Sequence, residues 1–580
     1  MNKDILHTVK SVMGCLLMAS LAAGCAQEDI GTVPTGGGGM SASSYVSFSF
    51  ASPQGAPTRS NPTGGEIGDG LEKGQDYEND ITSAVAFFYQ TSEGNGVNSG
   101  GNTTIEAVVE FNTINKIDET QSGVDRIYAT GAKQIDLENG KYNVLVVANP
   151  GNDKWWTGKT LTLADVRDHI HTAAWTASES GYSNFVMTSA ADATLTLESN
   201  PEDDPATAEV NVERMAARLD YKAEASYTCT DPAYSGATVE ITGAALVNNL
   251  TAGSYLLKRV ADDVNGVPTY LGNETPDAGV QTNYVLDPWT AGKTSANNSF
   301  TIGGEANKTA KDLYGEWFGN ISQDPNHWAA YVQPGTEMTV GTEKWQRIGY
   351  TLENTTAAEE AGKRYSTGVV FKAKFHPQGV ANYQDGETFF AYGTKIYASM
   401  EDMMAGFYGS EFADLDNITS CATWGDVKQF ITSTLLTNDP SGYNKYLEGL
   451  AEGKDDMEAV AGASLTWSNY MLNECGYSKD ENGKVVLDQN DKVTRIALKP
   501  YGTRTYEDAT CYYTWWVRHS NDNDDTKKGI MEYAIVRNNI YKLTVKSVYS
   551  LGGEVPDDES LIVDVYVNDW LLLDNETLPM

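Results

Sequence analysis

The sequence predicts an all-β fold with a few short helices, arranged as two antiparallel β-sandwich domains. Residues 45–50 alternate strictly, with Val46, Phe48 and Phe50 on one face and serines on the other, which is typical of a half-buried strand. Residues 142–148 are almost continuously apolar, as in a central strand. The composition agrees, because 55 glycines and 32 tyrosines among 580 residues favour short strands joined by turns.

The remaining elements are expected in chain order. Further strands are predicted at residues 81–89, 184–188, 209–221, 536–548 and 561–573. A helix is expected after Thr162, because Thr162 and Asp165 have the spacing of a capping box. His169 and His171 would follow on this helix, where residues two apart do not share a face, so exposed side chains are favoured over metal ligands. We place the domain boundary near residue 222.

Charge and motifs exclude several function classes. Lys and Arg number 41 against 79 Asp and Glu, a net charge of −38, which disfavours binding to nucleic acid. The chain has no catalytic serine elbow, zinc-protease motif, phosphate-binding loop or dinucleotide fingerprint. We therefore expect that the protein is not an enzyme and that it binds no metal and no cofactor. The pairs at residues 155–156 and 515–516 are tryptophans, for which packing within the sandwiches is favoured over sugar stacking.

The first residues are typical of an export signal. A short apolar run ends in small residues before Cys25, and it is shorter than the roughly 20 residues that span a bilayer. Residues 1–24 are thus predicted to be a lipoprotein signal peptide, with Cys25 as the lipidated residue. The alternative is an ordinary secretory signal with a chance cysteine at this position.

A basic residue follows the first strand. Between Lys10 and Arg59 the chain has no other lysine or arginine, and Arg59 lies in a segment rich in proline, glycine and asparagine. A protease that cleaves after arginine would therefore meet Arg59 first, and cleavage before Ser60 would release the strand at 45–50. The alternative is that Arg59 is one surface arginine among many.

The last strand ends the chain after an acidic segment at residues 554–560. Leu561, Val563, Val565 and Val567 share one face of this expected strand, and Trp570 follows them. Two interpretations remain open from the residues alone. The strand pairs within its own domain, or it is donated to another subunit by β-strand addition.

Several segments together resemble the major fimbrillins of Bacteroidetes type V pili, the shaft subunits of short or minor fimbriae. The resemblance lies in the residues around Cys25, in 45–50 running to Arg59, and in 141–150, 212–218, 536–543 and 563–570. It implies two transthyretin-like sandwich domains. It also implies a signal peptide (1–24), a lipidated propeptide with the first strand (25–59), an N-terminal domain (60–222), a C-terminal domain (223–550) and a donor-strand segment (551–580).

The same resemblance implies a function. The precursor would be an outer-membrane lipoprotein that a protease cleaves after Arg59. Removal of Val46, Phe48 and Phe50 would open a groove, which the C-terminal strand of another copy would fill, giving a surface fimbrium that supports adhesion and colonisation. Partners would be other copies of the chain, tip and anchor subunits, and the protease. A tip or accessory subunit, or a surface glycan-binding lipoprotein, is the alternative.

Overall fold

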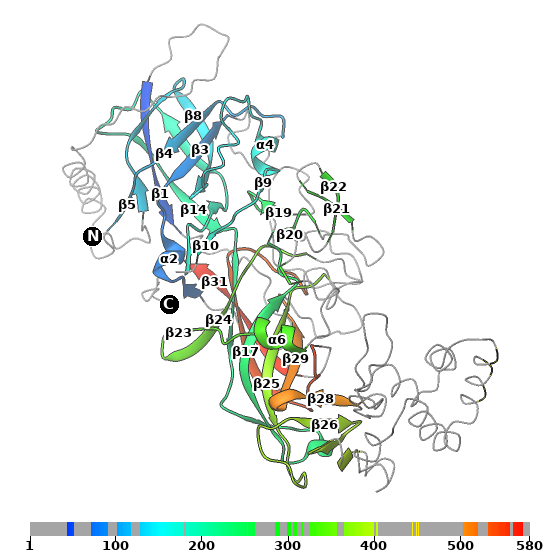
Figure 1. Ribbon diagram of the computed structural model, residues 1–580. Helices are drawn as coiled ribbons and strands as arrows, with labels where there is room; N and C mark the ends of the chain where they lie inside the picture. Colours follow the sequence, from blue (N-terminus) through cyan, green and yellow to red (C-terminus); the bar gives the residue numbers. More distant parts are fainter. Residues whose placement is uncertain are drawn as a thin grey trace, which may run out of the picture.

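The computed structural model describes residues 43–51, 71–90, 101–117, 128–178, 181–251, 253–260, 285–289, 299–302, 305–309, 315–316, 325–355, 365–399, 402–403, 444, 448, 451, 503–519, 532–556 and 561–571. These residues form an all-β fold, as predicted. Figure 1 shows the strands in two groups, with β1, β3, β8 and β14 in one and β17, β24, β25 and β29 in the other. The described helices are short: α2 (Asp76–Asn79), α4 (Leu163–Arg167), α6 (Pro325–Tyr331), and the single turns η2 (Pro232–Tyr234) and η7 (Glu507–Ala509).

The N-terminal group is one continuous ten-stranded network. Its strands, in spatial order, are β4 (Ala107–Phe111), β3 (Ala84–Tyr89), β8 (Gly140–Ala148), β12 (Met187–Ser189), β14 (Ala206–Arg214), β1 (Ser43–Ala51), β6 (Tyr128–Thr130) and β5 (Ile114–Lys116), with β13 (Ala193–Leu197) on β8 and β7 (Lys133–Asp136) on β1. A core of apolar side chains from β1, β3, β8 and β14 lies inside it. The central position of β8 agrees with its apolar sequence.

The C-terminal group packs two sheets face to face. The six-stranded sheet has the order β2 (Leu71–Lys73), β31 (Leu561–Leu571), β30 (Asn539–Val548), β15 (Ala217–Lys222), β24 (Glu343–Thr351) and β23 (Thr336–Val340). The four-stranded sheet is β16 (Tyr227–Thr228), β17 (Thr238–Val247), β25 (Gly368–His376) and β29 (Thr510–Trp516). Side chains from β15, β17, β25, β29 and β30 form the core between them.

Smaller sheets complete the described fold. They are β10 (Thr176–Ser178) with β11 (Gly181–Ser183), β9 (Ile170–His171) with β18 (Ser254–Tyr255), β19 (Arg259–Val260) with β20 (Val285–Leu286), β21 (Ser299–Ile302) with β22 (Glu305–Thr309), and β26 (Phe389–Tyr392) with β27 (Lys395–Tyr397) and β28 (Arg504–Tyr506). The β9–β18 pair joins the N-terminal part of the chain to the C-terminal part.

The strand expected at residues 209–221 is two strands in the structure. β14 ends at Arg214 and β15 begins at Ala217, and the two lie in different sandwiches. Asn538, which has a left-handed backbone with φ of 57°, fixes this crossing: its side chain accepts from the Arg214 amide at 3.0 Å, and its own amide donates to the Ala216 carbonyl at 2.9 Å. The change of sheet therefore falls a few residues before the boundary expected at 222.

The helix predicted after Thr162 is confirmed, but it is shorter than expected. Thr162 and Asp165 form the capping box, and α4 ends at Arg167. His169 and His171 therefore do not lie on a helix, and the prediction that both are exposed is wrong. His171 is 3% exposed, and the His169 ring stacks on Trp155 at 4.0 Å between ring centroids. Burial lowers the pKa of His169 to about 4, so it is neutral at physiological pH.

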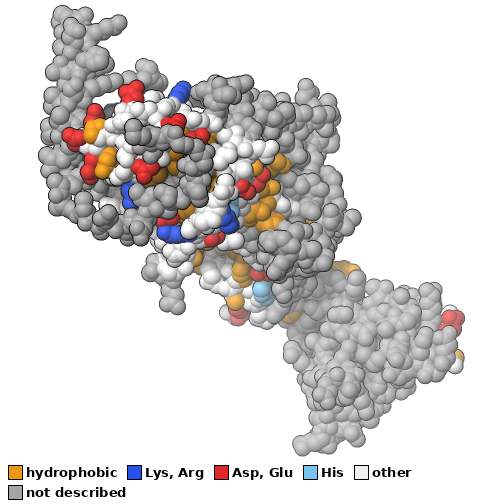
Figure 2. Space-filling view, turned by 90° about the horizontal axis from the view of Figure 1, so that it is seen from above, with side chains coloured by type: hydrophobic (Ala, Val, Ile, Leu, Met, Phe, Trp, Pro, Cys, Tyr) orange, Lys and Arg blue, Asp and Glu red, His pale blue; other side chains and the backbone are white. Residues whose placement is uncertain are grey.

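The described surface carries the acidic excess of the sequence. Figure 2 shows acidic side chains spread over the visible described face, with lysine and arginine at only a few points. Among the described residues, no helix has the length and apolar content needed to cross a bilayer.

Candidate functional site

β1 occupies an interior position between two sets of strands. On one side it runs parallel to β14, from Val46 opposite Ala206 to Ala51 opposite Asn211. On the other side it is antiparallel to β7 and β6. Both edges of β1 are therefore paired, although β1 lies far from β14 in the sequence.

The predicted alternation of β1 is confirmed by its burial. Val46, Phe48 and Phe50 are 0%, 2% and 0% exposed, whereas the serines between them are half-buried. The Phe48 ring meets Phe111 edge-on at 5.6 Å and Phe88 at 6.1 Å between centroids. Three such side chains contribute on the order of 5–9 kcal/mol of burial, at about 1.5–3 kcal/mol each. Loss of β1 would thus expose a long apolar slot.

The residues proposed for lipidation and processing lie outside the described residues. These are Cys25, Arg59 and Ser60. In the chain, Arg59 and Ser60 come between the end of β1 at Ala51 and the start of β2 at Leu71.

β31 pairs within its own chain, which is one of the two interpretations left open by the sequence. It is antiparallel to β30 from Leu561 opposite Val548 to Asp569 opposite Asn539. On its other side it pairs with the described residues of β2 at three positions, beginning with Leu71 opposite Asp569. Val563 is 6% exposed and belongs to the core between the two sheets. The strand register gives the positions of the other predicted donor residues. On β30, Leu561 is opposite Val548, Val565 is opposite Leu543 and Val567 is opposite Tyr541. On β2, Trp570 is opposite Glu72.

A buried charge cluster links β2 to the strands beside β31. Glu72 of β2 accepts from Arg218 of β15 and, at 2.6 Å, from Lys542 of β30. Arg218 also binds Glu78 of α2 at 2.8 Å and Asp220 at 2.9 Å. Burial acts to lower the pKa of Arg218, but these carboxylates outweigh it and hold that pKa well above its usual range. The cluster ties the segment that follows the proposed cleavage site to the C-terminal sheet.

Sequence reasoning missed this cluster. Arg218 lies in one of the segments that carry the family resemblance, but its partners Glu72 and Glu78 are distant in the sequence. The available signal was a pair of charged residues, Arg218 and Asp220, that alternate with the apolar residues at the start of β15. Charges at such positions are retained when they are paired.

The tryptophan pairs pack inside the domains, as favoured. Trp156 is buried and donates to Glu110 at 2.9 Å, while Trp155 stacks between Phe87 and His169. Trp515 packs against the core of the C-terminal sandwich.

The described part of the chain contains two buried thiols, Cys229 and Cys511. Burial raises the pKa of Cys229 to about 11 and that of Cys511 to about 12, so neither is a reactive thiolate at neutral pH. In the described part of the chain, no group of three or more His, Cys, Asp or Glu residues has a metal-binding arrangement.

The chain resembles known proteins in its C-terminal part and in its fold. Residues 504–576 match the family model for the C-terminal region of fimbrillin, the major fimbrial subunit protein type IV. This region contains β28 to β31. No curated protein sequence matches the chain.

Solved structures resemble the chain remotely. One is a proposed cell adhesion protein of Parabacteroides distasonis, with 10% identity, coverage of 91% of this chain and 100% of that chain, and a TM-score of 0.39. The fimbrilin FimA of Porphyromonas gingivalis has 13% identity, coverage of 91% and 98%, and a TM-score of 0.31. The tip fimbrial protein Mfa3 of the same organism, with a C-terminal truncation, has 9% identity, coverage of 91% and 100%, and a TM-score of 0.30.

These structural likenesses are too remote to carry an argument about this chain. The family match is therefore confined to residues 504–576, which resemble the C-terminal region of fimbrillin.

Proposed function

We propose that the protein is a fimbrial subunit that polymerises by strand exchange after proteolytic removal of β1. A protease cuts after Arg59, β1 leaves with the lipidated propeptide, and the C-terminal strand of another copy enters the vacated slot. The observation that carries the proposal is the position of β1. β1 fills an apolar slot between β14 and β6–β7. No other described strand lies between β1 and the proposed cut, so cleavage there would detach β1 and no other described strand.

β31 suits the role of donor in length and pattern. It has 11 residues, whereas β1 has 9, so it can fill the whole slot. Leu561, Val563, Val565 and Val567 repeat every second residue, as the apolar residues of β1 do. The contact would join the end of one subunit to the slot of the next, so it does not close and gives an open fibre.

The route to the surface forms part of the same proposal. Cys25 carries the lipid of an outer-membrane precursor, and cleavage at Arg59 separates the folded subunit from that anchor. Tip and anchor subunits would join the same fibre. A role as tip or accessory subunit differs in one respect: such a subunit would use only one of the two features, the slot or the donor strand.

The test uses the intact precursor and its Arg59→Ala variant. After treatment with an arginine-specific protease, the wild type should begin at Ser60 and form filaments visible by negative-stain microscopy. Arg59→Ala should remain monomeric, and Lys159→Ala, which alters an exposed basic residue elsewhere, should behave as wild type. Filaments of normal length from Arg59→Ala would contradict the processing step. A wild-type chain that is cleaved but stays monomeric would favour a monomeric surface lipoprotein.

A further inference from the structure

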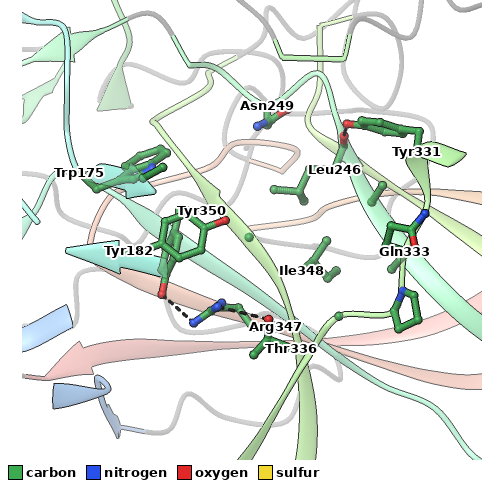
Figure 3. A pocket seen from close by; sticks show the side chains of 16 residues that line it. Trp175, Tyr182, Leu246, Asn249, Tyr331, Gln333, Thr336, Arg347, Ile348 and Tyr350 are labelled. Carbon is green, nitrogen blue, oxygen red and sulfur yellow. Dashed lines mark hydrogen bonds between the residues drawn. The ribbon is translucent and has the colours of Figure 1, made fainter. Parts of the chain in front are cut away.

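A pocket of about 430 Å³ lies where the two sandwiches meet. The N-terminal part contributes Trp175 and Tyr182, from beside and within the β10–β11 hairpin, and the C-terminal part contributes residues of β17, β23, β24 and α6. Figure 3 shows Trp175 and Tyr182 on one side, Tyr331 and Gln333 on the other, Arg347 at one end and Asn249 at the opposite end. Ligand sites commonly occur at such domain junctions, with volumes of about 300–1,000 Å³.

Several polar groups that line this pocket lack partners among the described residues. These groups are the indole N–H of Trp175, the hydroxyl of Tyr182 and the side-chain amide of Asn249. All three side chains are half-buried, and their polar atoms are not among the fully buried ones without a partner, so they are accessible to a ligand in the pocket. A packed domain contact usually pairs its polar groups, whereas a site for a polar ligand leaves donors and acceptors for that ligand.

Arg347 adds a positive charge that makes no direct ion pair with a described carboxylate, although the Tyr350 hydroxyl that it contacts donates to Glu78. Its Nη1 donates to the hydroxyls of Tyr77 and Tyr350, the latter at 3.4 Å, and its Nη2 donates to Thr336 Oγ1 at 3.3 Å. A guanidinium has five N–H donors. The Nε–H and one Nη2–H therefore have no partner within the described part of the chain. These are the two nitrogens that bind a carboxylate side-on. The rings of Tyr77, Tyr182 and Tyr350 lie 5.1 to 5.7 Å from the guanidinium carbon and hold it in place.

We propose that the pocket binds a carboxylated saccharide unit, such as a hexuronic or sialic acid. The carboxylate would bind the free edge of Arg347. The apolar face of the sugar ring would pack on Trp175 or Tyr182, and its hydroxyls would bond to the amides of Asn249 and Gln333. A purely apolar ligand would leave these polar groups unpaired, and a neutral sugar would leave the charge of Arg347 unused. The proposal does not depend on polymerisation, because the pocket is complete within one chain.

The experiment titrates the folded chain with D-galacturonate and N-acetylneuraminate by isothermal calorimetry. Galactose and methyl galacturonate serve as matched probes, because both lack the carboxylate charge. We expect saturable binding of at least one acid, weakened at least about tenfold when the charge is removed from the sugar. Competition by the bound acid against a mannuronate or guluronate oligomer would then show whether the site accepts a chain or only a single unit.

Variants separate this site from adventitious binding. Arg347→Gln should abolish the preference for the acid over its ester, whereas Lys344→Gln removes a positive charge from the same strand outside the pocket and should retain it. Asn249→Ala should weaken acid and neutral sugar alike, and it leaves the tyrosines around Arg347 untouched. Thermal unfolding would verify that each variant is folded. No binding of either acid, equal binding of acid and ester, or binding unchanged in both pocket variants would overturn the proposal.

Discussion

β1 and β31 are both long strands at the ends of the chain, but they are held differently. β1 has paired strands on both sides along its length, and its three apolar side chains are sealed. Among the described residues, β31 has one full ladder with β30 and a three-residue contact with β2 on the other side. An interior strand must break two ladders to leave, whereas a strand near an edge must break mainly one.

The difference explains why the proposed cycle treats the two strands differently. β1 can be removed irreversibly once its link to the rest of the chain is cut, and the slot then drives refilling. β31 stays covalently attached, so it must leave β30 by peeling. The charge cluster at Glu72 holds β2 against β31 during this step.

Removal of residues 561–580 should abolish filaments entirely, because no strand then refills the slot. The matched control removes 572–580 alone and keeps β31, and it should still polymerise. Size-exclusion chromatography after cleavage would measure the outcome, and circular dichroism would show that the shortened chain retains its β structure. Filaments from the longer deletion would mean that the donor lies elsewhere in the chain.

Phe48→Ala should destabilise the precursor but not the assembled filament. Truncating a buried Phe costs about 3–5 kcal/mol, so the precursor should unfold at markedly lower denaturant concentration. The assembled filament should be unaffected, because β1 is no longer present. Phe88→Ala alters the neighbouring ring in β3, which remains in the filament, and should weaken both forms. Equal destabilisation of filaments by the two variants would show that β1 is retained.

Glu72→Gln should loosen the hold of β2 on β31. The amide keeps some hydrogen bonds but not the charge, so Arg218 and Lys542 lose a buried partner at a cost of about 1–3 kcal/mol. Amide hydrogen exchange in β31 of the uncleaved monomer should accelerate. Glu343→Gln removes the half-exposed pair with Lys222 and should have little effect. Unchanged exchange in Glu72→Gln would show that β2 does not hold β31 in place.

Local sequence patterns predicted the strands and the helix start, but they did not predict contacts between residues far apart in the sequence. The alternation at 45–50 and the capping box at Thr162 are encoded within a few residues, and both are present in the structure. The crossing between Arg214 and Ala217 depends on Asn538, and the Glu72 cluster depends on Arg218 and Lys542. Each of these joins parts of the chain that sequence periodicity treats independently.

The burial of His171 shows the same limit. The capping box at Thr162 predicts a helix that includes both histidines, but residues 170–171 pair with β18 and His171 lies in the interior. The partner strand begins at Ser254, which no local pattern near the histidines could indicate.

The most direct test of the central claim is a reversible lock on β31. Thr544→Cys together with Asp564→Cys places two thiols at directly opposed positions of β30 and β31. The sequence also has six native cysteines, among them the buried Cys229 and Cys511, so the wild type and each single variant are oxidised in parallel as controls. After cleavage at Arg59, the oxidised double variant should remain monomeric, and adding a reductant should release filaments at the wild-type rate. Filaments that form while the disulfide is intact would contradict the claim that β31 leaves its own sheet to fill the slot of another subunit.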